Sequence, residues 1–240
     1  RSKPSAAVLS SSEGTGDAVK KLLVRGLVRL LSAVLAMGLL LFLPAGTMDF
    51  PRAWLLLALF FVPMTLLGAV LLVRSPALLE KRLHTREREP EQRGVLLASA
   101  ILLVLGFVTA GLDFRCGFTP LPWAVSIVGA LLFLFAYGLY TEVMRENAFL
   151  SRTVELQAGQ RVIDTGLYAV VRHPMYTAVL LLSAAIPLVL GSGAAILPFL
   201  SMGVALIFRI CGEERLLEAG LPGYADYKKR VKYRLIPWIW

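Results

Sequence analysis

Two groups of polar side chains flank a pair of apolar segments, 175–190 and 194–210, in the last third of the chain. The groups lie in "VVRHPMYTA" and "FRICGEERLL" and comprise Arg172, His173, Tyr176, Arg209, Glu213 and Glu214. The "GSG" between the segments predicts a tight helical hairpin, so both groups should meet at its open end. Cations beside carboxylates suit a zwitterionic ligand such as an amino-acid moiety. The glutamates would bind its ammonium, while arginine and free helix N–H groups would bind its carboxylate.

Each of these residues also has a purely structural interpretation. Arg172 could be a topology anchor at the membrane surface, His173 an interfacial histidine, and Arg209 with Glu213 an ordinary i,i+4 pair. Tyr224 and Tyr227, further along, are interpreted as interfacial aromatic residues. A carboxylate at a membrane edge destabilises the protein unless it is paired with a cation or binds a ligand. Taken together, the residues therefore predict a polar pocket with an apolar side entrance.

The elements that must position this pocket are membrane helices. Of the 240 residues, 57% are hydrophobic and only 17% are charged, and the mean hydropathy is +0.71. The apolar residues gather into six blocks, roughly 27–46, 53–73, 94–112, 123–141, 175–190 and 194–210. The first four are long enough to cross a hydrocarbon core of about 30 Å, and the last two are shorter. We predict an all-α, polytopic membrane bundle of about five or six transmembrane helices, with the C-terminal hairpin and an amphipathic C-terminal helix on the cytosolic side.

The net charge of +9 is distributed unevenly along the chain. Of the 25 Lys and Arg residues, only Arg52 and Arg115 lie in the loops on one side of the predicted membrane. A basic chain could instead bind nucleic acid, but this alternation is what the positive-inside rule expects. We predict six crossings, both termini in the cytosol and no nucleic-acid partner.

The pattern divides the chain into three parts. Residues 1–18 are rich in Ser, Ala and Gly and are predicted to be a disordered N-terminal arm. Residues 19–141 would form four transmembrane helices with a basic cytosolic loop at 74–93. Residues 142–240 would form a catalytic region made of a connector, the hairpin 175–210 and C-terminal helices. With two cysteines and two histidines in all, we expect no metal site.

The motifs "GLYAVVRHPMYTA", "RICGEERLL", "GYADYKKRV" and "RLIPWIW" resemble the isoprenylcysteine carboxyl methyltransferase family of integral membrane enzymes, especially its bacterial members. The resemblance covers roughly residues 140–240. The family pattern is RHPxYxG, an apolar hairpin and a Glu-Glu pair. Ala178 stands where the family usually has glycine, which bears on how closely another backbone can approach there.

The resemblance implies that S-adenosylmethionine binds on the cytosolic side and that a lipophilic or prenylated acceptor arrives from the bilayer, in a bacterial inner membrane rather than the endoplasmic reticulum. The residues implied to bind the cofactor are Tyr168, His173, Pro174, Tyr176, Glu213, Glu214 and Asn147. Those implied to act in catalysis are Arg172 and Arg209, which with Arg234 would also bind the acceptor. A carboxylate acceptor needs no base at neutral pH, whereas an amine acceptor must lose a proton, which His173 or a glutamate could take.

Two alternatives remain open from the sequence. Membrane sterol reductases that use NADPH have a similar C-terminal region, although no Gly-rich phosphate loop is present here. A non-catalytic scaffold that anchors lipid headgroups is the other alternative, and the Glu-Glu pair argues against it because it would repel anionic headgroups.

Overall fold

The computed structural model describes residues 6–83, 90–147, 149–150 and 159–240, and residues 84–89 of the predicted basic loop lie outside them. In these ranges every named element is helical, so the predicted all-α class is confirmed. The elements are α1 (Ala6–Ala45), α2 (Pro51–Arg74), α3 (Pro76–Leu83), α4 (Pro90–Cys116), α5 (Trp123–Glu146), the 3₁₀ turn η1 (Gly166–Ala169), α6 (Pro174–Leu190), α7 (Ile196–Gly220) and α8 (Tyr224–Arg230).

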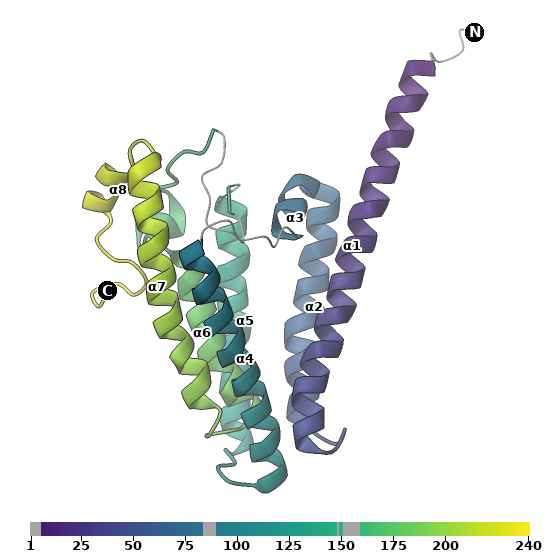
Figure 1. Cartoon of the computed structure of the whole chain (residues 1–240), viewed down its shortest axis with the longest axis vertical. Coiled ribbons are helices and arrows are strands. Elements are labelled where there is room, and N and C mark those ends of the chain that lie inside the picture. The colour runs from purple at the N-terminus through teal and green to yellow at the C-terminus, as the bar shows by residue number, and fades with distance from the viewer. Residues whose placement is uncertain (1–5, 84–89, 148, 151–158) are drawn as a thin grey trace.

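Five helices are long and apolar enough to cross a membrane, namely α1, α2, α4, α5 and α7. Helix α6 is apolar but only 17 residues long, about 26 Å at 1.5 Å per residue. When α6 is included, these helices run alternately in opposite directions along the bundle, and α8 lies at the end of the bundle where α7 ends (Figure 1). Helix α7 is longer than its apolar block predicted, because it continues through the charged residues after Arg209 as far as Gly220.

Helix α1 begins at Ala6 and so includes most of the segment that was predicted to be disordered. No proline follows Pro4 until Pro44, and Ala6 and Ala7 favour the helical state. Adding residues to an existing helix costs much less than nucleating a new one. The long apolar helix therefore gives this polar segment a template to extend, which its composition alone did not reveal.

The helices pack through a core that runs along the bundle axis. Leu41, Phe50, Phe107, Phe133 and Phe199 are among its most buried members and come from four helices and one loop. Glycine permits a close approach between α5 and α6. A Cβ atom added at Gly129 would lie 2.7 Å from both the Leu188 Cβ and the Val189 backbone nitrogen. Small residues at such crossings are typical of membrane helix pairs, which gain stability from close packing rather than from the hydrophobic effect.

A buried aspartate closes the end of the bundle opposite α8. Asp113, near the end of α4, accepts hydrogen bonds from the Thr119 backbone N–H at 2.7 Å and the Thr119 hydroxyl at 2.8 Å. It also accepts one from the Ser192 hydroxyl. The Thr119 carbonyl accepts from the Gly193 N–H at 3.0 Å. The α4–α5 loop is thereby joined to the α6–α7 turn, which fixes the closed end of the hairpin.

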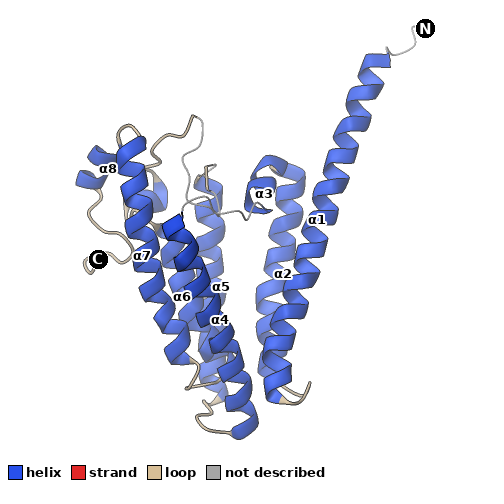
Figure 2. Ribbon diagram, viewed as in Figure 1, coloured by secondary structure: helices blue, strands red, loops and turns tan. Residues whose placement is uncertain are grey.

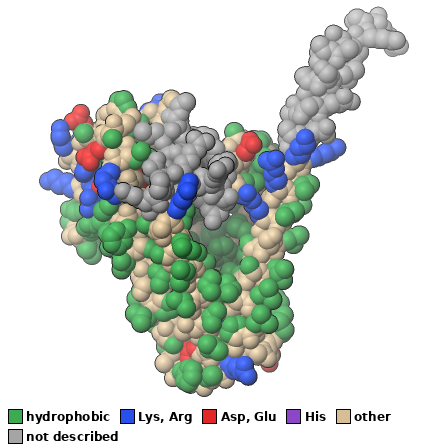
Figure 3. Space-filling view, viewed as in Figure 1, with side chains coloured by type: hydrophobic (Ala, Val, Ile, Leu, Met, Phe, Trp, Pro, Cys, Tyr) green, Lys and Arg blue, Asp and Glu red, His purple; other side chains and the backbone are tan. Residues whose placement is uncertain are grey.

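The described part of the chain is drawn as helices joined by loops in Figure 2. On the face shown in Figure 3, the outer surface is apolar along the length of the bundle and charged toward its ends. Large side chains such as Leu31, Leu66, Leu131 and Leu197 are at least 64% exposed. A contiguous apolar exterior of this size is unstable in water but is what a lipid environment requires. The chain is a multi-pass membrane protein.

We expect Gly129→Ala to destabilise the bundle by about 1–3 kcal/mol, because the added methyl group meets α6 backbone that cannot move aside. The matched control is Gly138→Ala on the same helix, where an added Cβ meets nothing within 4 Å. That change should be neutral or stabilising by up to about 1 kcal/mol. Thermal unfolding of the purified protein in detergent measures both, and equal effects would contradict close packing at Gly129.

Candidate functional site

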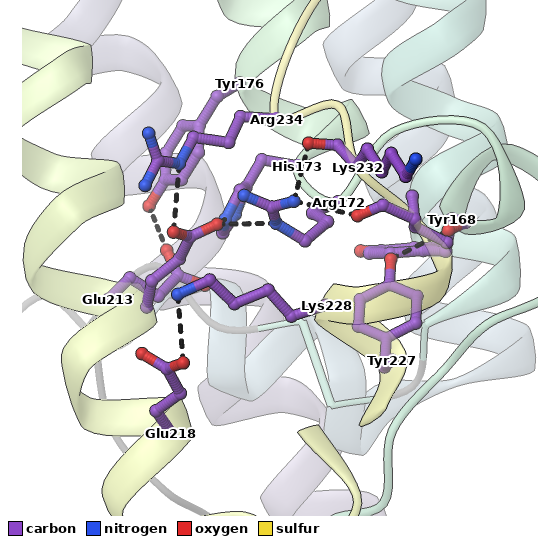
Figure 4. A network of polar contacts seen from close by, with 12 residues as sticks. Tyr168, Arg172, His173, Tyr176, Glu213, Glu218, Tyr227, Lys228, Lys232 and Arg234 are labelled. Carbon is purple, nitrogen blue, oxygen red and sulfur yellow. Dashed lines mark hydrogen bonds and ion pairs between the residues drawn. The ribbon is translucent and has the colours of Figure 1, made fainter. Parts of the chain in front are cut away.

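The carboxylate of Glu214 is the centre of a buried ion-pair network at the open end of the hairpin. Its partners Arg172, His173 and Arg234 are shown in Figure 4. Its Oε1 accepts from Arg172 Nε at 2.7 Å, and its Oε2 accepts from Arg234 Nε at 3.0 Å. The Glu214 side chain is 3% exposed and that of Arg172 is 5% exposed. Burying either charge alone would be costly, so the pair holds the loop before α6 against α7.

Arg172 also binds the chain that follows α8. Its Nη1 donates to the carbonyls of Val231 and Lys232, both at 2.8 Å. The backbone continues this contact, since the Arg172 N–H donates to the Tyr233 carbonyl at 2.9 Å. The C-terminal segment 231–235 is therefore held along the RHP motif.

His173 caps α6 and faces the same carboxylate. Its Nε2 lies 3.2 Å from Glu214 Oε1, and its backbone N–H donates to the Arg234 carbonyl at 3.0 Å. An ionised carboxylate only accepts hydrogen bonds, so this geometry assigns the proton to Nε2. Nδ1 is then the ring nitrogen able to accept a proton. Pro174 follows as the first residue of α6, where its missing N–H leaves no helix hydrogen bond unmade.

A second set of hydrogen bonds connects α6 and α7 around the Tyr176 hydroxyl. The hydroxyl donates to Glu213 Oε2 at 2.6 Å and accepts from Arg209 Nε at 3.1 Å. Arg209 also donates a hydrogen bond from Nη1 to Gln92 Oε1 at 3.3 Å, which connects α7 to α4. Arg209 and Glu213, four residues apart on α7, thus share a partner on the other arm of the hairpin.

These side chains face a cavity between the hairpin and the segments at its open end. Of the residues predicted for the site, seven line this cavity: Asn147, Tyr168, Arg172, His173, Tyr176, Arg209 and Glu213. Three others lie outside the lining: Pro174, Glu214 and Arg234. The structure therefore separates the two glutamates. Glu213 faces the cavity, whereas Glu214 lies behind its wall and faces the cations.

Tyr168 and Asn147 form another part of the wall. Asn147 ends α5, and its Nδ2 donates to the Tyr168 hydroxyl at 2.9 Å. The Tyr168 carbonyl in turn accepts from the Tyr227 hydroxyl at 2.7 Å. On the outer side, Lys228 of α8 pairs with Glu218 of α7 at 2.9 Å. These contacts fix α8 beside the cavity.

The two tyrosines of α8 were expected at the membrane interface, and this interpretation was wrong. Tyr224 and Tyr227 are 4% and 2% exposed, and both line the cavity. Burial raises the pKa of each hydroxyl well above its usual value, so both remain protonated and can donate hydrogen bonds at any physiological pH. The misassignment arose because a tyrosine at helical spacing near a membrane has the same sequence signature whether it faces lipid or a pocket.

Other residues of the site and its supports were harder to predict from the sequence. Gln92, the partner of Arg209, is 3% exposed although it lies in a charged stretch at the start of α4. The stretch 160–163 lines the cavity but has no recognisable motif. Asp113 could have been found, because an isolated aspartate beside an apolar block is expensive unless it is hydrogen-bonded.

Residues 124–221, which include most of α5 and all of α6 and α7, match the family model of phospholipid methyltransferases. The resemblance to membrane methyltransferases of the isoprenylcysteine carboxyl methyltransferase-like kind, which the motifs predicted, is thereby confirmed for residues 124–221. The comparison with curated proteins gave no match. The matched range ends just before α8, so Tyr224 and Arg234 lie outside it.

We expect Glu214→Gln to lower the free energy of unfolding by about 3 kcal/mol or more, because it leaves Arg172 buried without its counter-charge. Glu213→Gln, on the same helix and at the cavity wall, should change stability by less than about 1 kcal/mol, because the amide oxygen can still accept from Tyr176. Chemical unfolding of the two variants side by side tests this difference. Similar losses would contradict the separate roles assigned to the two carboxylates.

Proposed function

We propose that the protein is an S-adenosylmethionine-dependent methyltransferase that methylates a lipophilic acceptor at the cytosolic face of the membrane. The observation that supports it is a single cavity with two kinds of wall. One wall comes from the membrane hairpin and includes Met175, Tyr176 and Arg209. The other comes from the water-side segments, stretch 160–163 and α8. A lipid-like acceptor and a water-soluble cofactor could thus meet in one place. This cavity and its hairpin, with α8, would form the catalytic region 142–240.

The cavity residues fit S-adenosylmethionine by their chemistry. Glu213 offers a carboxylate to its ammonium or sulfonium charge, and the rings of Tyr168 and Tyr176 can face a cation. Leu217 and Leu221, also in the lining, suit a purine. The buried guanidinium of Arg209 could bind the cofactor's carboxylate or the acceptor's.

When bound, the cofactor supplies an electrophilic methyl group on a positively charged sulfur. In the transfer, a bond forms between the acceptor atom and the methyl carbon while the carbon–sulfur bond breaks, and its electron pair stays on sulfur. The contribution of the chain is positioning and exclusion of water. Arg209 and Arg172 would hold an anionic acceptor in line, and the hydrogen bonds of Tyr176 and Glu214 keep both guanidinium groups in place.

Two buried arginines in the lining favour an acceptor that carries a negative charge, such as the carboxylate of a prenylated cysteine. The match to phospholipid methyltransferases favours instead an amine headgroup as a second candidate. With an amine, His173 Nδ1 would be the acceptor of the proton, because Nε2 faces Glu214.

Calorimetric titration of the detergent-solubilised protein with S-adenosylmethionine and, separately, with NADPH tests the proposal. We expect the wild type to bind S-adenosylmethionine and Glu213→Gln to bind it about 10- to 100-fold more weakly, as loss of a charged hydrogen bond predicts. Glu218→Gln is the matched control: this carboxylate is on the same helix but is 41% exposed and paired to Lys228, and its loss should change nothing. Binding of NADPH alone would favour a reductase, and binding of neither ligand would favour a scaffold.

The pH dependence of the methylation rate distinguishes the two acceptors. With a prenylated cysteine carboxylate, whose pKa lies near 4, the rate should be flat from about pH 6 to 9 because the acceptor is already ionised. With a primary-amine phospholipid, the rate should rise with pH, about tenfold per unit below the pKa of the ammonium. Transfer of a labelled methyl group to each lipid in mixed micelles gives both profiles, and activity with only the amine would contradict the preference for an anionic acceptor.

A further inference from the structure

The hydroxyl of Tyr224 is buried beside the cavity without a partner. The Tyr224 side chain is 4% exposed, and its hydroxyl has no hydrogen-bond partner in the described part of the chain. A buried hydroxyl that makes no hydrogen bond destabilises a fold, and proteins retain few of them without a function. Tyr224 lines the same cavity as Glu213 and Tyr168, so a ligand there is the natural partner.

The second tyrosine of α8 provides an internal comparison. Tyr227 is buried to a similar degree, and its ring centroid lies 5.8 Å from that of Tyr224. Its hydroxyl, however, donates to the Tyr168 carbonyl at 2.7 Å. Tyr227 therefore has a complete structural role in attaching α8. Both rings pack with Leu221 and Val231, so packing accounts for the ring of Tyr224 but not for its oxygen.

The position of Tyr224 indicates which kind of ligand its hydroxyl would contact. The residue begins α8, outside the membrane-spanning helices, and Val162 from the stretch 160–163 packs against its cluster. Tyr224 therefore belongs to the wall of the cavity that is formed outside the membrane-spanning helices, where a water-soluble ligand is better suited than a lipid tail. The carboxylates of Glu214 and Glu213 act on the Tyr224 hydroxyl electrostatically, each more strongly than the opposing charge of Arg172. Their negative charge disfavours an anion at this point and favours a neutral acceptor atom.

On these grounds, and resting on the proposed function, we infer that the Tyr224 hydroxyl donates a hydrogen bond to a neutral acceptor atom of the cofactor's nucleoside, a ribose oxygen or a purine nitrogen. Because burial raises the pKa of this hydroxyl, it keeps its proton and acts as a donor. The contact lies in a segment beyond residue 221, where the family match ends. Tyr224 is thus a cofactor-binding residue rather than a structural one.

Tyr224→Phe and Tyr227→Phe, which each remove one oxygen, test the inference in the full-length protein. We expect Tyr224→Phe to weaken binding of S-adenosylmethionine about 5- to 20-fold, the size of one neutral hydrogen bond. In the ligand-free protein its melting temperature should be equal to or above that of the wild type, because no hydrogen bond is lost. Tyr227→Phe should instead lower the melting temperature, because the Tyr168 carbonyl loses its donor.

Competition with 5′-methylthioadenosine, which has the nucleoside but no amino-acid group, tests the part of the ligand assigned to Tyr224. Loss of affinity for both ligands by the same factor in Tyr224→Phe would support the nucleoside contact. A loss confined to S-adenosylmethionine would overturn it, and so would unchanged binding of both. If the folded wild type bound no S-adenosylmethionine, the proposed function itself would fail. If the wild type bound it and Tyr224→Phe bound it equally well, only the inference about Tyr224 would fail.

Discussion

The site depends on one buried carboxylate. Glu214 lies at the polar end of a membrane helix, where an unpaired negative charge would be prohibitively expensive. Its partners are Arg172 and His173 from the loop before α6 and Arg234 from the C-terminal segment. Three segments distant in the sequence must therefore meet on α7. Once Arg172 is held there, its Nη1 donates to the carbonyls of Val231 and Lys232, and the position of the RHP motif is set.

This network can orient the cavity only if the hairpin itself is rigid. Membrane helices gain little from the hydrophobic effect, so hydrogen bonds and close packing must hold them together. At the closed end, the hydrogen bonds of Asp113 join the α6–α7 turn to the neighbouring loop. Between the two ends, Gly129 allows α5 to lie directly against α6. Short α6 is thus fixed at both termini and along one side, and Tyr176 and His173 have little freedom to move.

Much of the fold could be predicted from composition because lipid leaves few options. Apolar blocks of about twenty residues become helices, and the GSG sequence between the last two blocks predicted the hairpin. Seven of the residues that line the cavity were also predicted from the sequence. What the sequence could not show was the direction of each side chain. Glu213 and Glu214 are adjacent and identical in the sequence, but successive side chains on a helix point about 100° apart. Glu213 therefore faces the cavity, and Glu214 faces the cations. The roles of Gln92 and Tyr224 could not be predicted for the same reason, because the burial of a side chain and its hydrogen-bond partners depend on tertiary structure.

The roles of the two glutamates also bear on the chemistry. Because Glu214 is surrounded by Arg172, His173 and Arg234, its own partners balance much of its charge, although it still acts on the Tyr224 hydroxyl. Glu213 remains as the carboxylate at the wall, opposite the guanidinium of Arg209 and bridged to it by Tyr176. A cationic cofactor and an anionic acceptor would then each find one oppositely charged group, on two sides of the same tyrosine. Methyl transfer from a sulfonium to a carboxylate removes the charge of both reactants, so electrostatic attraction to the site weakens as the reaction proceeds. The site must therefore also hold the two reactants in line by its shape. The rigid attachment of α6 and α7 provides that position.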